Sequence, residues 1–194
     1  MIEKLYVSMG FLRFLPHLLV FAFSGNRAII KEDICAYKNE YDLKGSTHFI
    51  LVHLLTHNTS FRSLFYHRIG KWKWICTLLG KGTVNLTIPP TVQIGSGLLL
   101  FHAYGTILNA KSIGKNCRIV HNVTLGDKNG KVPVIGNNVE LLPNAVITGD
   151  ITIGDHCVIG PGAVVFKSIP DNCVVVGNPA YILKKDGVIV NQKL

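Results

Sequence analysis

The chain has 194 residues, of which 48% are hydrophobic, and its formal net charge is +9 at pH 7. This length and apolar content suit one domain with a core of its own, with or without a helical appendage. The positive charge attracts anions such as phosphate-bearing cofactors. No run of five basic residues, zinc-finger spacing or RNP-like segment occurs, so no nucleic-acid partner is expected.

The first 24 residues contain the apolar stretch FLRFLPHLLVFAF. Arg13, Pro16 and His17 interrupt this stretch, and it is too short to span a bilayer. A signal peptide is conceivable, but the plainer interpretation is a helix buried in an N-terminal cap or in a subunit contact. Contact of residues 1–24 with a membrane surface stays open as an alternative.

Residues 1–84 show apolar residues at mixed three- and four-residue spacing, which predicts a helical N-terminal region. Thr59 or Ser60 is expected to cap the helix that runs through FRSLFYHRIGKWKWICTLLG, and Gly80 is expected to lie near its end. The five cysteines are widely spaced and include no CxxC pair, which indicates reduced thiols in a cytoplasmic protein. No third ligand accompanies the histidines of this region, so no metal is expected.

From residue 85 to residue 170 the sequence repeats every six residues. The first place of the repeat is aliphatic in every unit: Ile88, Ile94, Leu100, Ile107, Ile113, Ile119, Leu125, Ile135, Leu141, Ile147, Ile153, Ile159 and Val165. The next residue is often glycine, and the fifth place is small or branched. This pattern predicts a left-handed parallel β-helix, in which three hexapeptides make one triangular coil.

The expected fold is therefore mainly β, with three parts along the chain. A helical region covers residues 1–84, the left-handed β-helix covers residues 85–170, and residues 171–194 form a tail that folds back along the coils. The cysteines at the fifth place of the repeat, Cys117 and Cys157, are expected to pack in the core.

The six-residue spacing is interrupted twice. Leu100 and Ile107 are seven residues apart, and Leu125 and Ile135 are ten apart. Insertions emerge from a coil at one edge, where binding faces are built.

Two histidines lie near these breaks. His102 and His121 each occupy the third place of their hexapeptide, three units apart, so we expect equivalent positions on adjacent coils, with Cα atoms about 5 Å apart. The insertion at 127–134 is expected close to the same edge. Two imidazoles beside a protruding loop make a candidate catalytic site, although either histidine would also serve as an ordinary surface or core residue. No GxSxG, Walker A or GxGxxG motif offers another scheme.

Three short motifs carry a family resemblance. They are the HxxG of residues 102–105, VTLG at 123–126 and VVGNPA at 175–180. Together they resemble the serine O-acetyltransferase family of hexapeptide acyltransferases, and the likeness spans residues 60–183. The resemblance implies acetyl-CoA as co-substrate, a homotrimer or a multiple of it, and catalysis by a histidine that His102 matches. A neutral imidazole would remove the acceptor's hydroxyl proton at neutral pH.

The resemblance also suggests where acetyl-CoA would lie. In such proteins the pantetheine arm follows a coil edge and bonds to backbone, so small residues are nominated by position: Gly126, Ala145, Ala163 and Gly177. Lys184 and Lys185 are nominated for the phosphate groups, and His121 joins His102 as a catalytic candidate. For each Gly and Ala, simple packing of the repeat is the alternative role.

The sequence departs from the family pattern where the amino acid would bind. The family has an acidic residue before the HxxG histidine, where this chain has Phe101, and an Arg-His pair before the following proline. Here Lys131 and Val132 precede Pro133. The segments FHAYG and VHNVTLG also resemble capsular and exopolysaccharide O-acetyltransferases. The acceptor is therefore L-serine or, favoured by these departures, a saccharide hydroxyl; a non-catalytic β-helix scaffold is the alternative function.

Overall fold

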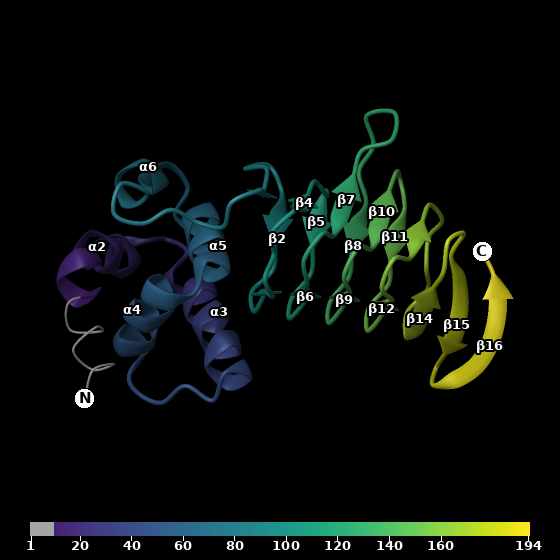
Figure 1. The fold of residues 1–194 in the computed structure, drawn as a ribbon, viewed down its shortest axis with the longest axis horizontal. Coiled ribbons are helices and arrows are strands. Elements are labelled where there is room, and N and C mark those ends of the chain that lie inside the picture. Colours follow the sequence, from purple (N-terminus) through teal and green to yellow (C-terminus); the bar gives the residue numbers. More distant parts are fainter. Residues whose placement is uncertain (1–9) are drawn as a thin grey trace. The chain divides into compact units, whose positions relative to one another are not determined.

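In the computed structural model, which describes residues 10–194, the chain divides into two units between Thr83 and Val84 (Figure 1). The first unit is helical. Its elements are α2 (Leu15–Phe23), α3 (Arg27–Glu40), α4 (Thr47–His57), α5 (Thr59–Ile69), the 3₁₀ turn η1 (Gly70–Trp72) and the short α6 (Lys73–Cys76). Residues 1–9 of the predicted apolar segment lie outside the described residues.

Side-chain caps set the start of the middle helices. The Ser46 hydroxyl accepts a hydrogen bond from the Phe49 N–H at the start of α4, and the Asn58 carbonyl oxygen accepts one from the Phe61 N–H at the start of α5. The cap of α5 is therefore Asn58, one residue before the predicted Thr59. The helix ends at Ile69 rather than near Gly80, because Gly70 takes a left-handed φ of 57° that no helix can continue through.

Aromatic side chains fill the core of the helical unit. Phe14, Phe21, Tyr37, Phe61 and Phe65 are each at most 1% exposed. A buried ion pair joins α3 to α5, with Arg68 Nε 2.8 Å from Asp33 Oδ2.

The second unit is the predicted left-handed β-helix, built from three parallel sheets. The first sheet holds β1 (Leu86–Thr87), β4 (Thr106–Leu108), β7 (Thr124–Gly126), β10 (Val146–Thr148) and β13 (Val164–Val165). The second holds β2 (Gln93–Ile94), β5 (Ser112–Ile113), β8 (Val134–Ile135) and β11 (Thr152–Ile153). The third holds β3 (Leu99–Leu100), β6 (Arg118–Ile119), β9 (Glu140–Leu141), β12 (Val158–Ile159), β14 (Cys173–Val176), β15 (Tyr181–Lys185) and β16 (Val188–Lys193).

Three edges join these sheets, and each is named here by what it carries. The histidine edge links the third sheet to the first through residues 101–105, 120–123, 142–145 and 160–163. The hairpin edge links the first to the second and includes residues 127–133. The glycine edge links the second to the third through residues 95–97, 114–116, 136–138, 154–156 and 170–172.

The interior of the coils follows the six-residue pattern with one slip. Every predicted inward aliphatic residue is buried except Ile88, which is half-buried, and Ile107, which is 43% exposed. Leu108 takes the inward place that was predicted for Ile107, because two extra residues rather than one enter after Leu100. Thr106 is also buried inside the coil, and its hydroxyl donates a hydrogen bond to the Val120 carbonyl at 3.3 Å.

The fifth-place residues also point inward. Cys117 and Cys157 are fully buried, and their thiols lie 3.2 and 3.1 Å from the carbonyl oxygens of Gly136 and Pro170. Burial raises the pKa of both thiols to about 11, so neither is a nucleophile near neutral pH. They serve the core packing that the sequence predicts.

Glycines let successive coils approach closely along the glycine edge. A Cβ on Gly114 would lie 2.3 Å from the Gly136 carbonyl oxygen, and one on Gly136 would lie 2.9 Å from the Asp155 nitrogen. Side chains bridge the same coils, since the Asn137 carbonyl oxygen accepts from the Lys115 N–H at 2.9 Å. The Asp155 carboxylate accepts in the same way from the Asn137 N–H, and this hydrogen bond lowers the pKa of Asp155.

Replacing Gly114 by alanine should therefore destabilise the β-helix by about 1–3 kcal/mol, the usual cost of overpacking a tight interior. Gly126→Ala is the matched control, because the nearest atom to its added Cβ is 3.6 Å away. Chemical denaturation of both variants gives the comparison. Equal unfolding midpoints for Gly114→Ala and the wild type would show that the coils have room to separate.

The C-terminal tail differs from the prediction. β14 continues the third sheet in parallel with β12, and β15 and β16 then add to it in antiparallel fashion. Gly177 and Gly187, with φ of 92° and 79°, lie at the chain reversals before β15 and β16. The tail therefore extends the stack beyond its last coil and does not fold back along it (Figure 1).

Candidate functional site

Hydrogen bonds define which residues correspond along the histidine edge. The N–H of Asn122 donates to the Tyr104 carbonyl at 3.0 Å, that of Asn144 to His121 at 3.3 Å, and that of Gly162 to Pro143 at 2.9 Å. These repeated bonds align one column of residues across four coils: Tyr104, His121, Pro143 and Pro161. The column lies at the turn of the coil and forms the outer rim of this edge.

His102 stands at the start of this edge, in the widest of its turns. Its side chain is exposed, its φ is 46°, and the Tyr104 N–H closes the turn on the His102 carbonyl at 2.6 Å. His156, on the glycine edge, also has a left-handed φ, of 57°, at a regular corner. The distinctive property of His102 is therefore its enlarged turn, which leaves an imidazole free of regular coil packing.

His121 is paired with a different residue from the one predicted. Its ring stacks on that of Tyr104, with centroids 5.2 Å apart and planes 15° apart. The predicted equivalence of His102 and His121 is wrong, because two extra residues of the first coil lie before Tyr104 and move Tyr104 into the matching place. His121 thus supports the turn that carries His102, and its exposure is only partial.

The residue before His102 also has a partner that sequence reasoning missed. The Arg118 guanidinium carbon lies 4.1 Å from the centroid of the Phe101 ring. The strand register explains this contact, since Arg118 pairs with Leu99, two residues before Phe101 and on the same face. A cation therefore lies where the related pattern has a carboxylate, and it covers one face of the apolar ring.

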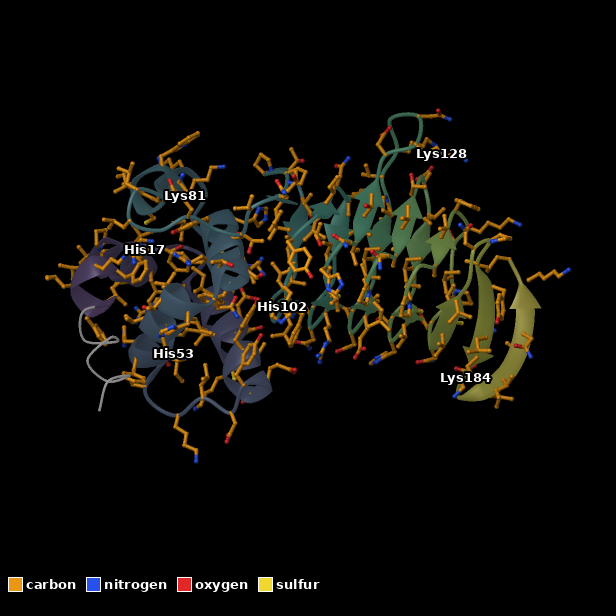
Figure 2. All side chains as sticks on the ribbon, viewed as in Figure 1. His17, His53, Lys81, His102, Lys128 and Lys184 are labelled. Atoms are coloured by element: carbon orange, nitrogen blue, oxygen red, sulfur yellow. The ribbon has the colours of Figure 1, made fainter. Side chains whose placement is uncertain are left out.

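The insertion emerges at another edge from the one predicted. Lys128 and Lys131 bridge a tight hairpin whose tip is Asn129 and Gly130, both with positive φ. This hairpin lies on the hairpin edge, so the first sheet separates it from His102 (Figure 2). At its base Lys131 Nζ lies 2.6 Å from Asp150 Oδ2 on the surface, and this contact raises the pKa of Lys131 and lowers that of Asp150.

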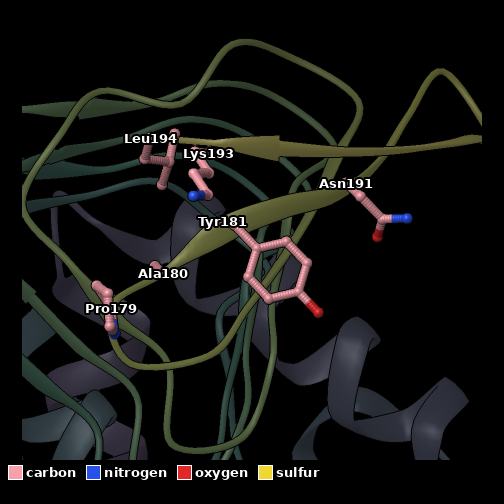
Figure 3. Close-up of a pocket in the computed structure, with 6 residues that line it drawn as sticks. All are labelled: Pro179, Ala180, Tyr181, Asn191, Lys193 and Leu194. Carbon is pink, nitrogen blue, oxygen red and sulfur yellow. The ribbon is translucent and has the colours of Figure 1, made fainter.

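The far end of the histidine edge carries a pocket. It is lined by Pro179, Ala180, Tyr181, Asn191, Lys193 and Leu194 (Figure 3). A smaller pocket shares Pro179, Ala180 and Leu194 and adds Val164, Phe166 and Lys167. Both pockets lie next to Gly177, whose carbonyl accepts from the Val164 N–H at 3.1 Å. Along the third sheet β14 lies four strand spacings from β3, or about 19 Å, and β16, which carries Lys193, lies six spacings from β3, or about 29 Å.

The nominated cofactor residues do not meet at one place. Ala145 and Ala163 are 0% exposed, and their N–H groups bond to the carbonyls of Leu142 and Gly160 within the coil. They offer no surface atom to a ligand, which favours the packing role over the cofactor role. Gly126 ends β7 beside the hairpin edge, so of the four small residues only Gly177 adjoins the pockets.

The nominated lysines lie elsewhere as well. Lys184 and Lys185 are exposed on β15, toward the turn into β16 (Figure 2). Ala145 and Ala163 occupy the fifth place of the repeat, which points inward, whereas the third place, which carries Pro143 and Pro161, lies at the surface. Lys193 had no signal because the tail leaves the repeat, whereas Lys167 occupies the third place of the unit that begins at Val165.

Comparisons with a family profile, with curated proteins and with solved structures give consistent results. The family profile described as "Bacterial transferase hexapeptide (six repeats)" matches residues 133–167. The serine acetyltransferase of Synechococcus elongatus is 31% identical over 145 residues, which cover 68% of this chain and 59% of that protein. The serine acetyltransferase of Staphylococcus aureus is 36% identical over 113 residues, covering 56% and 53%.

Solved structures agree. Serine acetyltransferase from Brucella abortus superposes with a TM-score of 0.67 at 28% identity, covering 83% of this chain and 69% of that one. Neisseria gonorrhoeae serine acetyltransferase in complex with serine gives a TM-score of 0.68 at 26% identity, covering 88% and 74%. The chain spans about three fifths or less of the length of the curated relatives it matches. It is a hexapeptide-repeat protein homologous to the serine acetyltransferases.

Proposed function

We propose that the protein is an acetyl-CoA-dependent O-acetyltransferase in which His102 is the general base. The observation that carries this proposal is the exposed imidazole in the enlarged HxxG turn of the histidine edge, in a chain homologous to serine acetyltransferases. The imidazole takes the proton of the acceptor hydroxyl, and the oxygen attacks the thioester carbonyl. The C–S bond then breaks, and the imidazolium returns the proton to the leaving thiolate. The test is a screen of hydroxyl acceptors for thiol release, with the acetylated product identified by mass.

Acetyl-CoA would lie along the histidine edge, with its thioester at His102 and its nucleotide end at the C-terminal pocket. The rim between them carries the half-buried Pro143 and the exposed Pro161 on successive coils, beside the exposed amides of Asn122 and Asn144. Lys193 and Lys167 provide positive charge for the phosphates at the far end. On this route Gly177 keeps its nominated role beside the cofactor, and part of the chain's net positive charge serves to bind the phosphate groups.

The double variant Lys193→Ala/Lys167→Ala should bind coenzyme A about tenfold more weakly than the wild type, since each loses a charge-assisted contact. Lys184→Ala/Lys185→Ala is the matched control, with the same loss of charge on the adjoining strand. Calorimetric titration with coenzyme A separates the two. If only the control pair binds coenzyme A more weakly, the phosphate groups are bound by Lys184 and Lys185 instead.

The acceptor proposed is a saccharide hydroxyl rather than L-serine. Phe101, with Arg118 against its ring, offers no carboxylate to an ammonium group, and Val132 offers no hydrogen bond. A pocket at the hairpin edge, which a neighbouring copy would bring to His102, is polar, with Gln93 and Asn109 in its lining beside Lys111 and the paired Lys131 and Asp150. Such hydrogen-bonding groups suit hydroxyl-rich ligands. Because acetyl-CoA is the proposed donor, we expect the reaction in the cytoplasm.

The assembly proposed is a trimer or a multiple of it. One chain carries His102 and the hairpin on different edges, so its own hairpin cannot cover its own histidine. A neighbouring copy related by threefold symmetry would bring its hairpin edge against this histidine edge and enclose the ligand. Sedimentation equilibrium should give at least three times the chain mass of 21.3 kDa. A fully active monomer would contradict this arrangement.

A further inference from the structure

Helix α2 of the helical unit is apolar on the side that faces solvent as well as on the side that faces the core. Its sequence is LPHLLVFAF, and its one polar side chain, His17, points inward, is 0% exposed and lies 3.2 Å from the Tyr66 hydroxyl. The outward residues Leu15, Leu19 and Phe23 are 49%, 53% and 87% exposed. A helix that is hydrophobic all round is ordinarily covered on every side.

A second exposed apolar segment packs beside this helix. Trp72, Trp74, Ile75 and Leu78 are between 50% and 83% exposed on η1, α6 and the turn that follows. α6 contacts α2, and the Arg13 Nε donates to the Leu79 carbonyl at 2.6 Å (Figure 1). The exposed apolar residues of the two segments form what we call the tryptophan face: Leu12, Leu15, Leu19, Phe23, Trp72, Trp74, Ile75 and Leu78.

The charged residues that flank the tryptophan face in the sequence have one sign. Lys71 and Lys73 alternate with the tryptophans, with their Nζ atoms 5.9 and 5.5 Å from the rings of Trp72 and Trp74. Exposed Lys81 follows, and no Asp or Glu occurs anywhere between Asp42 and Asp127. The sequence from residue 10 to residue 31 is also free of acidic residues.

We propose that the tryptophan face binds the surface of an anionic membrane. Leucine and phenylalanine would enter the boundary of the acyl chains, tryptophan would lie at the headgroup level, and lysine would pair with anionic headgroups. A second copy of the chain is a poorer occupant, because a twofold contact through this face would oppose like charges. No helix among the described residues is long and apolar enough to cross a bilayer.

Intrinsic tryptophan fluorescence reports on this contact, since the two tryptophans of the chain both lie in the tryptophan face. Vesicles of phosphatidylcholine with phosphatidylglycerol should pellet the full-length protein, shift its tryptophan emission to the blue and shield it from iodide. Vesicles of phosphatidylcholine alone should do so much less. The absence of pelleting with the anionic vesicles would overturn the proposal.

Two variant pairs sharpen the test. Phe23→Ser/Leu78→Ser should lower vesicle partitioning at least tenfold, whereas Val188→Ser/Ile189→Ser, at two apolar residues of β16 that are 64% and 63% exposed, should leave it unchanged. Lys71→Gln/Lys73→Gln should lower it roughly tenfold, against Lys44→Gln/Lys115→Gln as a control of equal charge.

The same variants distinguish the competing occupant. Sedimentation without vesicles should give one assembly mass for the wild type and every variant. A smaller mass for Phe23→Ser/Leu78→Ser, or equal partitioning of all variants, would show that a second copy covers the face or that binding is unspecific, and either would overturn the proposal.

Discussion

His102→Ala should lower turnover between a hundredfold and ten-thousandfold, the range expected when a general base is removed. The imidazole contacts the acceptor hydroxyl in the proposed mechanism and carries no packing role, since its side chain is exposed. Coenzyme A affinity and the unfolding midpoint should therefore stay close to wild type. Steady-state kinetics with the best acceptor, together with calorimetric titration, measures both quantities.

His156→Ala is the matched control for this variant. His156 is also exposed and also adopts a left-handed φ, but it lies on the glycine edge. Its removal should leave turnover unchanged. Wild-type turnover in His102→Ala would remove His102 from the catalytic role, whatever the control shows.

L-Serine should be a poor acceptor, with a kcat/KM below about 10⁴ M⁻¹s⁻¹, the lower end of ordinary enzymatic values. A buried or enclosed ammonium group needs an anionic partner. The residue before His102 is instead Phe101, with the Arg118 guanidinium 4.1 Å from its ring centroid, and neither side chain supplies a carboxylate.

The measurement is a direct comparison of kcat/KM for L-serine with values for mono- and oligosaccharides, at one acetyl-CoA concentration. A serine value above that limit would contradict the saccharide proposal and make serine acetylation the activity.

The coils of the β-helix were predictable because burial repeats with the chain. Each inward place, such as Ile119 or Leu141, meets the same environment one coil further on, and the aliphatic pattern records it. The helix caps and the geometry of the β-helix edges were harder to predict from the sequence. Asn58 and Thr59 both suit a helix start, and only the hydrogen bond to the Phe61 N–H decides between them.

The catalytic role of His102 stays a prediction, but the structure corrects several of the neighbours expected for it, and these errors share a cause. His102 was singled out because the repeat breaks beside it, but counting residues could not say where in that turn the extra residues lie. Tyr104 rather than His102 therefore faces His121. The insertion lies one sheet away on the hairpin edge, and Arg118 was overlooked because contacts across strands depend on register. Residues of the tail, such as Lys193, follow no repeat at all.

A crystal structure with coenzyme A bound tests the central claim most directly. We expect the sulfur to lie within reach of the His102 imidazole, the pantetheine to follow the rim past Pro143 and Pro161, and the nucleotide to occupy the pocket beside Lys193. Coenzyme A bound along the hairpin edge or the glycine edge, with its sulfur remote from every His102 of the assembly, would contradict the proposed site and its mechanism.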